Sequence, residues 1–131
     1  MGGRWNHRGT PLVYLAESIA LATLEVLVHL QDMDTLPKYV LRRFSFDATL
    51  VQELPRTHLP VDWAMFPHPQ STKVIGEEWV SGGSSVLLKV PSAVSPREAN
   101  YLLNPLHPDV EKIEIRSVLG HTFDSRLTRL L

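Results

Sequence analysis

The residue that first raises a chemical question is Glu25, in the middle of the apolar stretch LATLEVLVHL at residues 21–30. On a helix, residues three and four apart share a face, so Glu25 lies in line with apolar neighbours such as Leu21. A carboxylate held against apolar surface is costly unless it is neutralised, paired or faces a polar cleft. Glu25 is therefore a catalytic candidate. The helix alone leaves open a structural glutamate paired with an arginine: Arg4, Arg42 or Arg43.

Three further residues have types suited to a site for an anionic or aromatic ligand. Arg4 lies in GGRWN, where glycines allow close backbone approach and the guanidinium offers a planar fork for phosphate or carboxylate. Tyr14 lies in a short predicted strand before the Glu25 helix and could stack on a ligand ring. Ser92, in PSAV, places a hydroxyl at a strand end. Each has a structural alternative, namely a surface loop, a core tyrosine and a cap.

Other known site patterns are absent from the sequence. The six histidines show neither i, i+4 pairing nor the HExxH motif, so we expect no metal. His29 follows Glu25 by one turn and is interpreted as structural. A GxSxG elbow, a Walker loop and GxGxxG are also missing.

The elements that must position these residues can be read from periodicity and end signals. We expect a short strand at 12–15, a helix from its cap Ser18 to about residue 31, and a strand over 39–46. Residues 54–70 are rich in proline and should be irregular. A helix over 71–83 with a glycine stop and a core strand over 85–90 follow.

The last third of the chain carries a local helix signal. Serine, proline and glutamate in SPRE at residues 95–98 resemble a capped first turn and predict a short helix carrying residues 100–103. Asn104 and Pro105 would stop it. A strand is predicted over 112–116, and residues 123–131 stay unassigned. This mixed order of elements favours the α+β class.

Composition limits the function classes. The 131 residues, with 44% hydrophobic and 21% charged residues, predict a single globular domain. A formal net charge of −1 provides no field for a polyanion, so direct nucleic-acid binding is not expected. The absence of cysteine suits a reducing cytosol. The apolar run over 19–30 is too short to span a bilayer, and we expect a cytoplasmic protein without membrane contact.

Three segments taken in order resemble the RES domain: GGRWNHRGTPLVYLAES, IALATLEVLVHL and IGEEWVSGGSSVLLKVPSAVSPREANYLLNPLHPD. The resemblance implies an ADP-ribosyltransferase-like mixed β core flanked by helices. It also implies the toxin of a bacterial type II toxin–antitoxin pair, partnered by an Xre-family antitoxin. Members consume NAD by splitting the nicotinamide–ribose bond with water or phosphate, or by transferring ADP-ribose to a protein. NAD is then the substrate.

The resemblance also implies roles for individual residues. Glu25 would stabilise the oxocarbenium-like transition state, and Arg4 would clamp the pyrophosphate. Tyr14 would stack on nicotinamide, while Ser92 would bind the ribose or orient Glu25. Asn104, in YLLNP, would bind substrate. Arg126, in FDSRL, is similar to the family's terminal motif and need not touch substrate.

The resemblance leaves alternatives. RES proteins usually continue upstream of GGRWN with a strand, a helix and a basic residue, so we expect one RES domain over 1–131 that is short at its N-terminus. A non-catalytic antitoxin-binding module left by truncation is one alternative. A protein ADP-ribosyltransferase on the same scaffold is another. Oligomeric state stays open, with a homodimer among the options.

Overall fold

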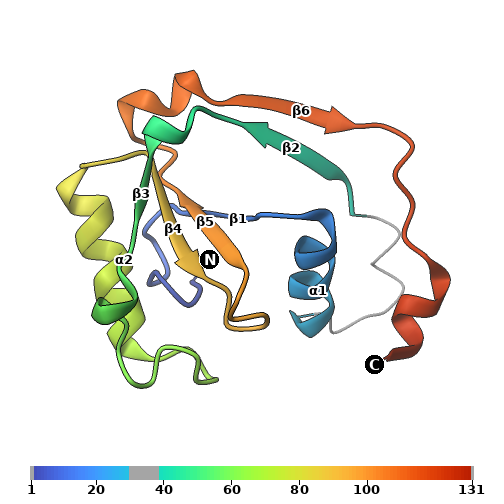
Figure 1. Ribbon diagram of the computed structural model, residues 1–131, viewed down its shortest axis with the longest axis horizontal. Coiled ribbons are helices and arrows are strands. Elements are labelled where there is room, and N and C mark those ends of the chain that lie inside the picture. Colours follow the sequence, from blue (N-terminus) through green and yellow to red (C-terminus); the bar gives the residue numbers. More distant parts are fainter. Residues whose placement is uncertain (1, 30–38, 131) are drawn as a thin grey trace.

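A computed structural model of the chain describes residues 2–29 and 39–130 (Figure 1). Two α-helices and six strands follow one another as β1 (Val13–Ala16), α1 (Ile19–His29), β2 (Leu41–Ser45), β3 (Val51–Glu53), α2 (Gln70–Gly82), β4 (Leu87–Pro91), β5 (Ala99–Leu103) and β6 (Glu114–Val118). Short 3₁₀ turns include η3 (Arg56–His58) and η5 (Ser125–Leu130). The predicted α+β class is confirmed, and the arrangement is consistent with an ADP-ribosyltransferase-like core of mixed β structure with helices.

The larger sheet has four strands in the order β1-β5-β4-β3. β5 pairs antiparallel with both β1 and β4, and β3 pairs parallel with β4. β2 and β6 form a separate antiparallel pair, which lies apart from the larger sheet in Figure 1. β5 and β4 are the two inner strands, and β5 connects β1 to the rest of the sheet.

The helix predicted over residues 100–103 is wrong, because these residues belong to β5. The local signal does form a turn: the Ser95 hydroxyl donates to the Glu98 carboxylate at 2.5 Å, and the Glu98 N–H donates to the Ser95 carbonyl at 2.9 Å. The turn does not continue as a helix because the following residues hydrogen-bond to strands on both sides. Pairing with distant strands therefore overrides the local preference.

The other predicted elements are largely confirmed. The Ser18 hydroxyl accepts a hydrogen bond from the Leu21 N–H at 3.1 Å and caps α1; the predicted end of this helix, residues 30–31, lies outside the described residues. Gly83, with φ of 63°, ends α2 in the left-handed conformation that glycine favours. Residues 54–70 are mostly irregular, with η3 as a short exception. The short strand β3 had no sequence prediction.

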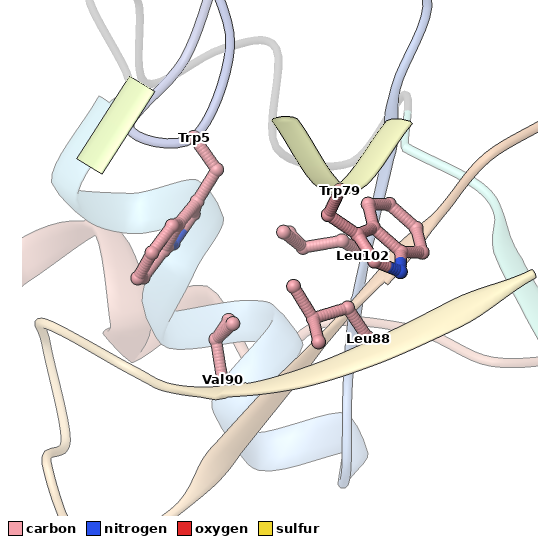
Figure 2. Packing of buried hydrophobic residues seen from close by; sticks show 5 residues of the cluster. All are labelled: Trp5, Trp79, Leu88, Val90 and Leu102. Carbon is pink, nitrogen blue, oxygen red and sulfur yellow. The ribbon is translucent and has the colours of Figure 1, made fainter. Parts of the chain in front are cut away.

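The core has two parts, one on each face of the larger sheet. On one face Trp5 and Trp79 pack over Leu88, Val90 and Leu102 (Figure 2). The other face packs a second cluster: Val86, Leu87, Leu103 and Ile113. Successive strand residues alternate between the two clusters, as the pleat requires. In the described ranges, no helix has the length and apolarity needed to cross a membrane.

Candidate functional site

A cavity of about 510 Å³ opens on the Trp5 face of the larger sheet. This volume lies within the usual range for small-molecule sites. Its polar and aromatic lining comes from the N-terminal segment (residues 2–10), β1, α1, a residue shortly before β2, the proline-rich segment and β5. These residues are Arg4, Trp5, Tyr14, Glu25, His29, Tyr39, His68 and Asn100. Three of the residues singled out from the sequence, Arg4, Tyr14 and Glu25, therefore meet at one cavity.

Glu25 is held by two side chains from the β4–β5 connection and β5. Its Oε1 accepts hydrogen bonds from the Ser92 hydroxyl at 2.7 Å and from the Asn100 amide nitrogen at 3.3 Å. Ser92 is fully buried, and its Oγ also accepts from the N–H groups of Val94 and Ser95 at 3.2 and 3.1 Å. Since a hydroxyl has one proton, Ser92 directs that proton to Glu25. Within the described residues no salt bridge involves Glu25, so the arginine pairing left open from sequence is not observed.

Arg4 is half-buried and tied to the proline-rich segment. Its Nη1 donates to the carbonyl oxygens of Trp63 at 2.9 Å and Met65 at 2.7 Å. Burial lowers the pKa of Arg4, while the negative charge of Glu25 opposes that shift. The two side chains thus act on each other electrostatically across the cavity.

The Tyr14 hydroxyl is used for structure, whereas its ring remains accessible. The hydroxyl donates to Asn6 Oδ1 and accepts from the Trp5 N–H at 3.1 Å. Burial raises the pKa of Tyr14 to about 12, although the Trp5 hydrogen bond and the charge of Arg4 act in the opposite direction. The residue as a whole is 41% exposed. A neutral hydroxyl therefore fixes the ring at the cavity wall.

The structure does not bring Asn104 to the cavity. Asn104 follows the far end of β5, where its side-chain oxygen accepts from the Leu106 N–H at 3.1 Å and its own N–H donates to Val86 at 3.0 Å. Its side chain stabilises a buried turn. Arg126 is also absent from the cavity lining and pairs with Asp124 at 2.8 Å.

Asn100, and not the predicted Asn104, is the asparagine that lines the cavity. It pairs across the sheet with Ala16 and Val90, in the same pattern that places Tyr14 opposite Leu102. Residues in these rows share the Trp5 face. Within the described structure, Asn100 Oδ1 is buried without a hydrogen-bond partner, a costly arrangement that calls for an explanation. Reading residues 99–103 as a strand would have revealed Asn100 from sequence.

Two histidines, His29 and His68, also line the cavity. His29, interpreted as structural from sequence, lies on the wall with its ring centroid 6.2 Å from that of His68. Burial lowers the pKa of His68, and the positive charges of Arg4, His29 and Lys73 lower it further. The sequence missed His68 because the fold of residues 54–70 could not be predicted. In the part of the chain described, no three His, Asp or Glu side chains form a potential metal-binding group.

Comparisons with known proteins bear on the whole chain. The family model described as RES domain matches residues 1–127. Toxin Res of Yersinia enterocolitica is 42% identical over 128 residues, covering 96% of this chain and 84% of that protein. Toxin Res of Pseudomonas putida is 40% identical over 130 residues, covering 97% and 86%. A Sphingobium protein named Prs ADP-ribosylating toxin is 38% identical over 131 residues, covering 98% and 81%. This chain belongs to the RES domain family.

Proposed function

We propose that the chain is the toxin of a bacterial type II toxin–antitoxin system and consumes NAD by cleaving the nicotinamide–ribose bond. The observation that carries this proposal is the placement of the Glu25 carboxylate. Ser92 and Asn100 hold it on the wall of a cavity that also presents Arg4 and Tyr14. The names of the Yersinia and Pseudomonas relatives support the toxin role.

The chemistry of the bond explains the need for a fixed carboxylate. Cleavage passes through an oxocarbenium-like transition state, and an anion near the ribose gains interaction energy as positive charge develops. Ser92 and Asn100 both bond to Glu25 Oε1. We therefore assign Oε2 to the ribose. Nicotinamide leaves as a neutral molecule from a cationic substrate, so the proposal requires no metal.

The remaining cavity residues suit the other parts of NAD. Arg4 uses Nη1 for two backbone carbonyls, and a guanidinium has further N–H groups that can bind the pyrophosphate. The exposed ring of Tyr14 offers a surface on which nicotinamide can stack. Asn100, and not Asn104, which was predicted to bind substrate, contacts Glu25 and positions it.

The reaction that the chain catalyses depends on which molecule accepts the ADP-ribose, and two classes of acceptor are possible. Water or phosphate would make the chain an NAD glycohydrolase or phosphorylase. A protein acceptor would make it an ADP-ribosyltransferase, a candidate favoured by the name of the Sphingobium relative. Adenine-labelled NAD separates them: the label ends in a small molecule in the first case and on protein in the second.

The test is nicotinamide release from NAD by the purified full chain, followed by chromatography and mass spectrometry. Glu25→Gln keeps the shape of the side chain and removes its charge. We expect the rate to fall by about 10²- to 10³-fold, or roughly 3–4 kcal/mol, as for loss of a preorganised electrostatic group. Glu78→Gln, at an exposed position of α2, is the matched control. Unchanged turnover in Glu25→Gln would contradict the assignment of Glu25.

The proposed partner is an Xre-family antitoxin, acting with the toxin in the cytoplasm. Calorimetric titration of the chain with the product of a neighbouring helical Xre-like reading frame tests this directly. Tight antitoxin binding together with no binding of NAD would instead favour a non-catalytic antitoxin-binding module.

A further inference from the structure

We propose that His68, together with Arg4, forms a proton-linked binding position for a phosphate-bearing ligand, so that the ligand binds together with a proton on His68. The inference rests on the proposed function, because it describes how the same cavity receives the anionic part of its substrate. It assigns a role to the proline-rich segment, which otherwise contributes only a wall.

The position of His68 is fixed by contacts at both ends of the proline-rich segment. Arg4 donates to the Trp63 and Met65 carbonyls a few residues before His68. His68 lies just before α2, where the Thr72 hydroxyl donates to the Arg4 carbonyl at 2.6 Å. Arg4 is therefore bonded to the segments on both sides of His68, and the guanidinium and the imidazole line one cavity.

The rings around His68 hold the imidazole at the cavity wall. Phe66 packs edge-on with its centroid 5.6 Å from that of His68, and the ring of His29 has its centroid 6.2 Å from that of His68. His68 is half-buried, so its ring faces both protein and cavity. A ligand in the cavity can reach it without local unfolding.

The charges acting on His68 come from three parts of the fold. Arg4 of the N-terminal segment, His29 of α1 and Lys73 of α2 all disfavour its protonated form, and burial adds to this effect. Glu25, the carboxylate of the cavity lining, is bonded to Ser92 and Asn100. The surroundings of His68 thus hold more groups that carry or accept positive charge than carboxylates. An anion placed among them would reverse the balance and favour protonation of His68.

The affinity for an anionic ligand should fall as the pH rises. Burial and the nearby positive charges hold the pKa of His68 below its ordinary value of 6.5, which favours the neutral ring at pH 7. An anion raises this pKa, and the complex takes up a proton between the free and bound values. Affinity is therefore highest below the free pKa and falls as pH rises toward the bound pKa. A shift of one unit corresponds to about a tenfold loss of affinity.

The experiment is isothermal titration of the full chain with ADP-ribose, which carries the diphosphate and cannot be turned over by loss of nicotinamide. Runs near neutral pH in two buffers of different ionisation enthalpy measure proton uptake. We expect uptake by the unmodified chain, and about a tenfold weaker affinity at about pH 8 than at about pH 6. His68→Asn should abolish both. His58→Asn, at an exposed histidine of η3, should keep both.

Other results of the titration identify the source of the phosphate group or contradict the inference. Inorganic phosphate in place of ADP-ribose distinguishes the source. Because phosphate itself titrates near neutral pH, only uptake that is lost in His68→Asn counts, and such uptake with phosphate as well as with ADP-ribose extends the position to a free phosphate acceptor. Binding of ADP-ribose without uptake, or uptake that persists in His68→Asn, overturns the inference and leaves the proposed function standing. Absence of ADP-ribose binding, with unchanged circular dichroism, overturns the inference; if nicotinamide release from NAD is absent as well, the proposed function is overturned too.

Discussion

The wall of the cavity that carries Glu25 is built from side chains that bond to one another, whereas the wall that carries Arg4 is an irregular segment fixed onto α2. Glu25 depends on two direct partners, Ser92 and Asn100. The N-terminal segment, residues 2–10, depends on bonds to α2 that both its backbone and its side chains make. The Glu77 carboxylate accepts from the His7 N–H at 2.7 Å, and Thr72 bonds to the Arg4 carbonyl.

This difference separates residues that act on the reaction from those that act on the shape of the site. A change beside Glu25 alters how a charge is held, with a limited effect on the rest of the molecule. A change beneath the N-terminal segment displaces Trp5, which belongs to the core, together with Arg4, which belongs to the cavity. The comparison can be tested on each wall separately.

The largest effect on stability is expected at Gly76, where α2 meets the N-terminal segment. A β-carbon at this position would overlap the Trp5 carbonyl oxygen. Gly76→Ala should therefore lower the free energy of unfolding by about 3 kcal/mol, measured by urea denaturation. Gly82→Ala, in the same helix with open space around it, should cost nothing or add about 0.5 kcal/mol. Equal free energies of unfolding for the two variants would show that the cavity wall carrying Arg4 does not depend on close packing against α2.

The next effect concerns the two asparagines of the β5 region. Asn100→Ala removes one hydrogen bond to the Glu25 carboxylate, and kcat should fall by about tenfold to a hundredfold, or ~1.5–3 kcal/mol. Asn104→Ala should leave kcat unchanged and lower the free energy of unfolding by about 1–2 kcal/mol, because it removes a buried turn contact. Steady-state kinetics and denaturation of both variants decide the matter; a loss of kcat in Asn104→Ala alone would contradict our placement of the site.

The smallest effect is a pH dependence of the N-terminal segment. His7 bonds to Glu77 and Gln70, which raises the pKa of His7, and the His7 bonds lower the pKa of Glu77. The raised pKa of His7 adds stability below 6.5, which is lost as pH rises through the folded value. The lowered pKa of Glu77 adds stability above 4.5, which is lost as pH falls through its folded value.

Together these shifts place the optimum contribution of the pair between pH 4.5 and 6.5. Denaturation across this range should show a stability maximum that is reduced in Glu77→Gln. Glu111→Gln, an exposed glutamate in the 3₁₀ turn Pro108–Lys112, serves as the comparison. A maximum of the same height in Glu77→Gln would show that the pair does not hold the segment.

Sequence was sufficient where a local signal and the tertiary structure agree. Ser18 and Gly83 marked the ends of their helices because capping depends on a few neighbouring residues. The family resemblance, carried by long segments in order, was confirmed. The resemblance implied that Arg4, Tyr14 and Glu25 belong to one site, and all three side chains line the same cavity.

The sequence-based prediction was wrong where hydrogen bonds to distant strands determine the backbone conformation. The SPRE turn has the residues of a helix start, yet the strands on both sides of residues 99–103 impose an extended backbone. That error hid the sheet register, and with it the cavity position of Asn100. His68 was hidden for another reason: an irregular segment has no period from which the direction of a side chain could be predicted.

The β4–β5 connection has a consequence for how the site fluctuates. Ser92 is the first residue of this connection and Asn100 is the second residue of β5; the connection is closed by a bond from the Ser92 N–H to the Glu98 carbonyl at 3.0 Å. A short hairpin tip of this kind opens as one cooperative unit. This unit includes Ser92 but not Asn100, which pairs with Ala16 and Val90 inside the sheet, so opening of the connection would remove one support of the Glu25 carboxylate and leave the other in place.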